Sequence, residues 1–143
     1  MQDWEKIYMS YVNDSQENLA KRAKEHVVDI YKAFVEKTDD KKGSYMFVVN
    51  LFASYIAADK EITRSEWALF NYIFEIEDSE DHEKLEYALN NFRNLTSYDE
   101  LNTIIDQCEP ELKVTIIKLG LCICAIDGRI SVPEQEIIAR YAN

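Results

Sequence analysis

The stretch Asp127-Gly-Arg-Ile-Ser-Val-Pro-Glu134 joins a strongly apolar segment to the last amphipathic segment of the chain. Sixty-eight residues earlier stands a similar stretch, Asp59-Lys-Glu-Ile-Thr-Arg-Ser-Glu66. Both read Asp-x-x-Ile-Ser/Thr-x-x-Glu, and each follows an apolar segment and precedes an amphipathic one. Two copies of one helix-turn-helix pattern predict a fold organised around a pair of acidic turns.

The similarity between the two copies extends into the segments around the turns. When residues 46–73 are aligned with residues 114–141, apolar character matches at most helix positions. The identical pairs before the turns are Leu51 with Leu119 and Ala57 with Ala125. We therefore expect two similar helix pairs about a pseudo-twofold axis, with their apolar central helices side by side.

Apolar residues recur with the helical period along the rest of the chain. A short helix over 1–12 precedes a second one, which runs from a capping box at Asp14 and Glu17 to about Lys37. The apolar stripe of this second helix consists of Leu19, Ala23, Val27, Ile30 and Phe34. Further helices are predicted over 45–58, from the first acidic turn to about 76, over 82–93, from a capping box at 97–100 to about 108, over 112–126, and from the second acidic turn to about 141. Pro110, which carries no N–H, suits the first turn of the helix that leads into 112–126.

A polar run over 37–44 forms the connector before the first apolar helix, with Gly43 as its turn residue. No segment alternates with the period of two that marks a half-buried strand. The prediction is a single all-α domain over 1–143, a compact bundle of seven to eight helices, with the helix over 1–12 peripheral to it.

The composition supports a helical domain and limits the classes of partner that the domain is expected to bind. The 143 residues are 47% apolar, and only 3 Gly and 2 Pro supply turns, too few for an all-β fold. The net charge is −11, from 27 acidic and 16 basic residues, and no basic stripe offsets it. Such a chain repels phosphate backbones, so we expect divalent cations or protein partners and no nucleic acid.

The sequence predicts a cytoplasmic protein without a membrane span. The longest apolar run, 45–58, is too short to cross a bilayer and contains Asn50 and Ser54. The N-terminal residues lack the basic and apolar segments of a secretory signal. The three cysteines have no metal-ligand spacing, and Cys122 and Cys124 point to different sides of a helix. Buried free thiols are expected, as in a reducing compartment.

The second acidic turn matches the second half of an EF-hand calcium loop. Asp127 falls at position 5 of the twelve-residue loop, Gly128 at position 6 and Glu134 at position 12. Positions 1 and 3 should carry oxygen ligands, but they hold Ile123 and Ala125. The first copy has a tyrosine and an alanine there, so an EF-hand is excluded.

Helix capping explains part of the motif. Thr63 and Ser131 are suited to N-cap positions, and Glu66 and Glu134, three residues later, complete capping boxes. The aspartates are not explained in this way, because an acid at a helix C-terminus opposes the helix dipole by about 1 kcal/mol or less. A cation or hydrogen bonds from the following turn would relieve that cost. A purely structural role and a divalent-cation site both stay open.

The pattern Ala-x-Asp-Gly-x-Ile-Ser-x-x-Glu at 125–134, after an apolar helix of a small acidic chain, resembles the TerB-like tellurite-resistance family. The copy at 57–66 is weaker, since Lys60 replaces the glycine. With the flanking helices, the resemblance covers roughly residues 15–143. It implies an all-helical fold of two related halves, a cluster of acidic residues that binds divalent metal, and a cytoplasmic role in stress response, often within larger assemblies.

When the acidic positions of the family are carried over to this sequence, the resemblance implies one metal site that the two acidic turns share. A hard ion that prefers oxygen ligands, Ca²⁺ or Mg²⁺, would suit it, and no other cofactor is expected. The implied ligands are Asp59, Glu66, Asp127 and Glu134, with Glu61 and Glu136 as outer acids.

Three functions are compared. The preferred one is a TerB-like, non-enzymatic module that binds a divalent cation, a protein partner, or both. The alternative is a structural adaptor without metal, whose acidic face meets a basic partner through exposed aromatic residues. A hydrolase is not expected, because the chain has no nucleophile motif and no glycine-rich phosphate loop, and His26 and His82 are isolated.

Overall fold

The computed structural model describes residues 9–57, 64–74, 83, 95–126 and 132–142. Across these ranges the regular secondary structure is entirely α-helical, so the predicted all-α class is confirmed for them. Residues 9–12 form one further helical turn. The helices are α2 (Gln16–Thr38), α3 (Lys41–Ala57), α4 (Arg64–Phe74), α6 (Leu95–Asp106), α7 (Pro110–Ala125) and α8 (Val132–Ala142).

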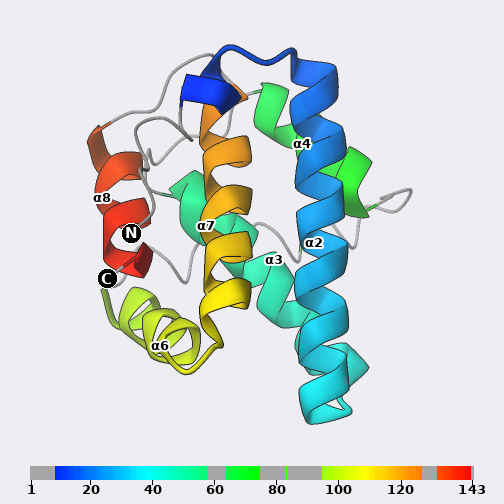
Figure 1. Ribbon diagram of the computed structural model, residues 1–143, viewed down its shortest axis with the longest axis vertical. Helices are drawn as coiled ribbons and strands as arrows, with labels where there is room; N and C mark the ends of the chain where they lie inside the picture. The colour runs from blue at the N-terminus through cyan, green and yellow to red at the C-terminus, as the bar shows by residue number, and fades with distance from the viewer. Residues whose placement is uncertain (1–8, 58–63, 75–82, 84–94, 127–131, 143) are drawn as a thin grey trace.

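The long helices α2 and α7 lie side by side and share the most extensive contact between elements (Figure 1). Helix α3 packs against both of them and crosses behind them in this view. Helix α4 lies along the N-terminal half of α2, while α8 and α6 lie on the other side of α7. None of the described helices is both long and apolar enough to cross a membrane.

Helix α2 buries the stripe that its sequence predicts, since Leu19, Ala23, Val27 and Ile30 are at most 7% exposed. These positions recur every three or four residues and therefore lie on one face of a helix. Phe34, the next member of the predicted stripe, is half-buried against the same core. The face of α2 toward α3 and α7 thus follows directly from the spacing of its apolar residues.

The cap of α2 differs from the prediction by one residue. Ser15 has an extended backbone, and its hydroxyl oxygen accepts a hydrogen bond from the Asn18 backbone N–H at 3.1 Å. Asp14, the predicted cap, accepts instead from the Ser15 N–H at 2.9 Å and from Arg22 at 3.1 Å. Both residue types cap well, and the one directly before the first helical residue takes the role.

The connector predicted over 37–44 is much shorter in the structure. Only Asp39 and Asp40 separate α2 from α3. Asp39 adopts a left-handed conformation with φ 52°, and its N–H donates to the Val35 carbonyl oxygen at 2.8 Å. The Asp40 carboxylate accepts from the Gly43 N–H at 2.9 Å, so Gly43 lies in the first turn of α3. The predicted turn role of Gly43 is wrong, because two aspartates supply the turn and the cap.

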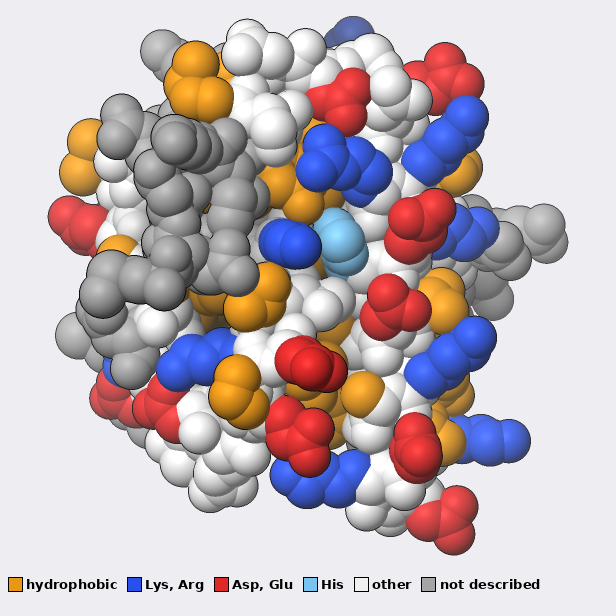
Figure 2. Space-filling view, in the orientation of Figure 1, with side chains coloured by type: hydrophobic (Ala, Val, Ile, Leu, Met, Phe, Trp, Pro, Cys, Tyr) orange, Lys and Arg blue, Asp and Glu red, His pale blue; other side chains and the backbone are white. Residues whose placement is uncertain are grey.

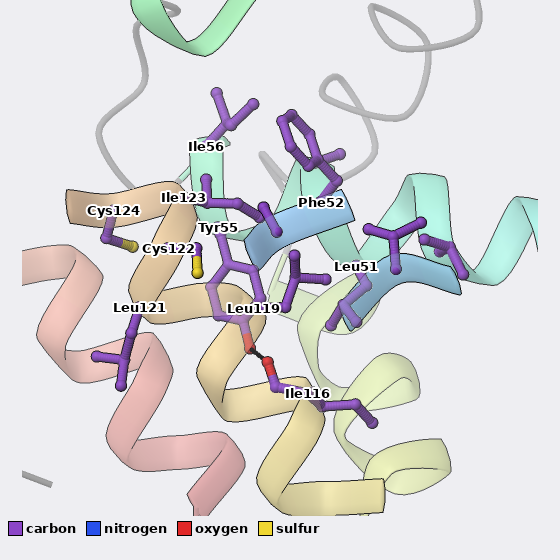
Figure 3. Close-up of a cluster of buried hydrophobic side chains, with 14 of the residues drawn as sticks. Leu51, Phe52, Tyr55, Ile56, Ile116, Leu119, Leu121, Cys122, Ile123 and Cys124 are labelled. Carbon is purple, nitrogen blue, oxygen red and sulfur yellow. Dashed lines mark hydrogen bonds between the residues drawn. The ribbon is translucent and has the colours of Figure 1, made fainter. Parts of the chain in front are cut away.

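The apolar helices α3 and α7 contact each other, as expected (Figure 3). Tyr55 of α3 reaches across to α7, where its hydroxyl donates to the Ile116 carbonyl oxygen at 2.9 Å. The ring passes over Gly120, where a side chain would overlap it. Cys122 and Cys124 on the same helix are buried free thiols, as predicted, whereas Cys108 is only half-buried.

Two other helix starts can be compared with the predictions. Helix α6 begins at Leu95, so Ser97 lies inside the helix and is not its cap. Helix α7 begins with Pro110 at its first position, as predicted, after Glu109 at the N-cap. The first eight residues lie outside the ranges that the structure describes, as does the helix predicted over 82–93 apart from residue 83, which is helical.

The described parts of the two helix pairs follow the order that the repeat predicts. The apolar helix α3 precedes α4, and the apolar helix α7 precedes α8. The residues of the two acidic turns, 58–63 and 127–131, lie outside the described ranges. The N-cap roles of Thr63 and Ser131 therefore stay predictions.

Candidate functional site

The structure describes two of the four predicted metal ligands. Glu66 lies in the first turn of α4, and Glu134 in the first turn of α8. Asp59 and Asp127 lie outside the described residues, as does the outer acid Glu61. The other outer acid, Glu136, is exposed on α8.

Both described glutamates are buried. The exposed fraction is 2% for Glu66 and 4% for Glu134. Glutamate is almost never buried so deeply without a partner. Each of the two takes part in a hydrogen bond, an ion pair or another electrostatic interaction within the chain. Their burial places two carboxylates in the interior at the start of equivalent helices.

The buried faces of α4 and α8 correspond at three positions. Each face begins with the glutamate and continues one and two turns later with large side chains. The corresponding members are Glu66, Phe70 and Ile73 on α4 and Glu134, Ile138 and Tyr141 on α8. Leu69 is also buried on α4, whereas its counterpart Ile137 is partly buried. Because each member of one set is 68 residues from its counterpart, the sequence offset also describes which side of each helix faces the core.

Gln16, the first residue of α2, joins the two motif copies. Its side-chain amide nitrogen donates to the Ile126 carbonyl oxygen at 2.9 Å and lies 3.4 Å from the Ser65 hydroxyl oxygen. Those two oxygens cannot be farther apart than the sum of the two distances. Ile126 directly precedes Asp127, and Ser65 directly precedes Glu66. The structure therefore brings the end of one apolar helix next to the start of α4.

Gln16 was missed by reasoning from the sequence. As the first helical residue after a cap, it carries no pattern that distinguishes it from a solvent-exposed glutamine. Its two partners are 49 and 110 residues away along the chain, so only the packing of α2 against α4 and α7 reveals its role.

No group of three or more His, Cys, Asp or Glu side chains within the described ranges could hold a metal ion. Asp59 and Asp127 lie outside these ranges. The predicted cluster of four carboxylates therefore stays a prediction.

Comparison with protein-family models, with curated proteins and with solved structures finds no match. The chain is therefore interpreted from its own residues and geometry.

A second polar cluster surrounds His26, which the sequence indicated to be structural. The Tyr11 hydroxyl lies 3.4 Å from the imidazole Nε2, and the Arg22 guanidinium carbon lies 3.7 Å from the Tyr11 ring centroid. Arg22 in turn pairs with Asp14 at 3.1 Å. The cluster fastens the helical turn at 9–12 to α2, which is a structural role.

Burial and nearby cations shift the proton equilibria in this cluster. Burial lowers the pKa of His26, and the neighbouring Lys118 and Arg22 lower it further. Burial also raises the pKa of the Cys122 thiol beneath the cluster to about 12. The thiol is therefore protonated and unreactive at neutral pH, which gives no support for nucleophilic catalysis here.

Proposed function

We propose that this protein is a non-enzymatic, TerB-like binding module that holds a divalent cation, Ca²⁺ or Mg²⁺, between its two acidic turns. The proposed ligands are Asp59, Glu66, Asp127 and Glu134. The family resemblance and the role in stress response that it implies rest on the motif residues at 57–66 and 125–134.

The observation that carries the proposal is the double contact of Gln16. It links the residue before Asp127 to the residue before Glu66. Carboxylates held close together repel one another, and each raises the cost of ionising the next. A hard divalent cation relieves this repulsion and prefers carboxylate oxygens as ligands.

Helix capping is the competing explanation for the two glutamates, and one substitution separates it from metal binding. Glutamine completes a capping box as glutamate does, but it is a poor replacement for a carboxylate ligand. Glu66→Gln and Glu134→Gln should therefore weaken cation binding while the protein without metal stays folded.

Calorimetric titration of the metal-free protein with Ca²⁺ and with Mg²⁺ tests the proposal directly. We expect saturable binding that Asp127→Asn and Glu134→Gln each weaken at least about tenfold, as expected when one charged ligand is lost. Glu36→Gln is the matched control, since it removes one charge from an exposed site on α2. The absence of binding at millimolar metal, together with an unchanged melting temperature in Asp127→Asn, would remove the cation from the proposal.

The metal-free adaptor is the alternative. It has the same fold and acidic surface, and its partner binding is insensitive to a chelator. Figure 2 shows acidic and basic side chains interspersed on one face, with no continuous patch of either sign among the described residues of that face. This face offers no extended acidic surface for a basic partner, which makes the adaptor the second choice.

A further inference from the structure

An open groove lies between α2 and α4. Its volume is about 480 Å³, within the range of about 300–1,000 Å³ found for binding pockets. Side chains from both helices line it, together with Ile126 at the end of α7. Of the proposed metal ligands, the structure describes Glu66 and Glu134, and neither lines the groove.

The two helices run in the same direction along the groove. At one end Gln16 of α2 lies beside Ser65 of α4. At the other end the Lys24 ammonium group lies 5.1 Å from the ring centroid of Tyr72. Residues 16–24 therefore lie alongside residues 65–72, a length of about 12 Å, or two helical turns.

The groove has a floor of small and apolar side chains. Ala20 of α2 and Ala68 of α4 leave space between the helices, and Leu69 lies beneath them. Tyr72 is 44% exposed at one end, and Val28, one turn beyond Lys24 on α2, is 38% exposed. Exposed large apolar side chains beside a hollow are typical of a surface that binds another molecule.

Among the described residues, the rim of the groove carries more cations than anions. Lys21 and Arg64 line it, Lys24 stands at its end, and Glu17 is the one acid among the described lining residues. Glu17 is paired with Lys21 at 3.4 Å, whereas Arg64 makes no ion pair with any other described residue. In a chain of net charge −11, this concentration of cations favours an acidic partner.

We propose that this groove binds an amphipathic acidic helix of a partner protein. Apolar anchors spaced i, i+3 or i+4, and i+7 on such a helix span two turns, which matches the length of the groove. Acidic residues beside that apolar stripe face Lys21 and Arg64. The proposal goes beyond the cation site, because helix binding needs no metal.

Two synthetic peptides of roughly 18 residues, long enough to form helix in solution, test the proposal. Both carry leucines at i, i+3 and i+7; the flanking residues are glutamates in one and lysines in the other. Binding to the full chain is measured by fluorescence anisotropy in the presence of a chelator, so the result does not depend on the cation site. We expect the acidic peptide to bind about tenfold more tightly, with affinity that falls as salt rises.

Charge reversal on the rim identifies the binding surface. Arg64→Glu should weaken binding of the acidic peptide and strengthen that of the basic one. Lys32→Glu is the matched control, since it makes the same change at an exposed position of α2 beyond the groove. Amide chemical shifts of Ala20 and Ala68 should change with the acidic peptide, which locates the contact on both walls.

Three results would overturn the proposal. The first is equal affinity for the two peptides, or no binding of either at millimolar concentration. The second is peptide binding that Arg64→Glu and Lys32→Glu weaken equally. The third is self-association, measured by sedimentation, that Arg64→Glu abolishes, since the occupant would then be a second copy of this chain.

Discussion

Gly120 is the residue on which the close contact between α3 and α7 depends. A Cβ atom at this position would overlap the Tyr55 ring and lie 2.8 Å from its hydroxyl oxygen. The ring is fully buried and hydrogen-bonded to the Ile116 carbonyl oxygen, so it has little freedom to move aside. Interiors packed at this density resist even one added methyl group.

Gly120→Ala is therefore expected to lower the free energy of unfolding by about 1–3 kcal/mol. This loss outweighs the helix propensity that alanine gains over glycine, about 1 kcal/mol. Urea unfolding followed by circular dichroism measures it. Gly43→Ala is the control, because a Cβ there meets only the exposed carboxylate of Asp40. Equal effects of the two substitutions would contradict the proposed role of the Tyr55 contact.

His26 makes stability depend on pH in a defined direction. Its pKa in the folded state lies below the ordinary value of 6.5, first because it is buried and then because Lys118 and Arg22 repel its charged form, while Asp29 and Glu25 act in the opposite sense. Below pH 6.5 the unfolded chain therefore binds more protons than the folded protein. The contribution of His26 to stability is present above pH 6.5 and is lost as pH falls toward the folded-state pKa.

We expect the melting temperature to fall between pH 7.5 and pH 5.5, and to fall less steeply in His26→Gln. Carboxylates titrate alike in both proteins, so the difference between the two slopes isolates His26. Identical slopes would mean that the imidazole titrates in the folded protein as it does in the unfolded chain.

At the scale of elements, polar contacts add to the packing of Leu101 and Ile105 in attaching α6 to the bundle. One of them is the ion pair of Asp106 with Lys113 of α7 at 3.2 Å. The Tyr98 hydroxyl donates to the Ser54 carbonyl oxygen of α3 at 3.1 Å, and burial raises the pKa of Tyr98 to about 12. Asp99, the next residue, pairs with Arg140 of α8, and its side chain is 66% exposed. Solvent screens the ion pair but not the buried hydrogen bond.

Tyr98→Phe should therefore destabilise the protein by about 1–2 kcal/mol, and Asp99→Asn by less than about 1 kcal/mol. Chemical denaturation of the two variants measures the difference. A larger loss in Asp99→Asn would show that the surface ion pair, and not the buried hydroxyl, attaches α6.

The ends of the helices show where local sequence is sufficient. Pro110 starts α7 as predicted, because a proline lacks the N–H that a first helical residue would leave unpaired. The sequence did not show which of two adjacent residues would cap α2, and Ser15 takes the role predicted for Asp14. Asp14 is used instead by Arg22, which lies over the Tyr11 ring. The choice between two good caps depends on contacts that are distant in sequence.

At the scale of the whole molecule, α2 connects the parts that the repeat relates. It packs against α3, α4 and α7, and its first residue contacts both motif copies. The apolar and acidic positions of the two copies were enough to indicate the repeat from the sequence. It contained no indication that a helix outside the repeat would join them.

The same helix also explains why the groove was not predicted. The exposed face of α2 reads as an ordinary alternation of Lys, Glu and Ala. Only its parallel alignment with α4 collects Lys21 and Arg64 on one rim above Ala20 and Ala68. The two cations come from different helices, so whether they lie together depends on how the helices are rotated relative to each other. The periodicity within one helix gives no information about that rotation.

The sequence by itself determined the helical class, the apolar stripe of α2 and the two buried central helices. These follow from periodicity and capping, which act over a few residues. Only the tertiary structure decided that Tyr55 passes over Gly120, that Gln16 links the two motif copies, and that cations gather beside an open groove. Such contacts join residues tens of positions apart, and side-chain packing selects them from many arrangements with the same local pattern.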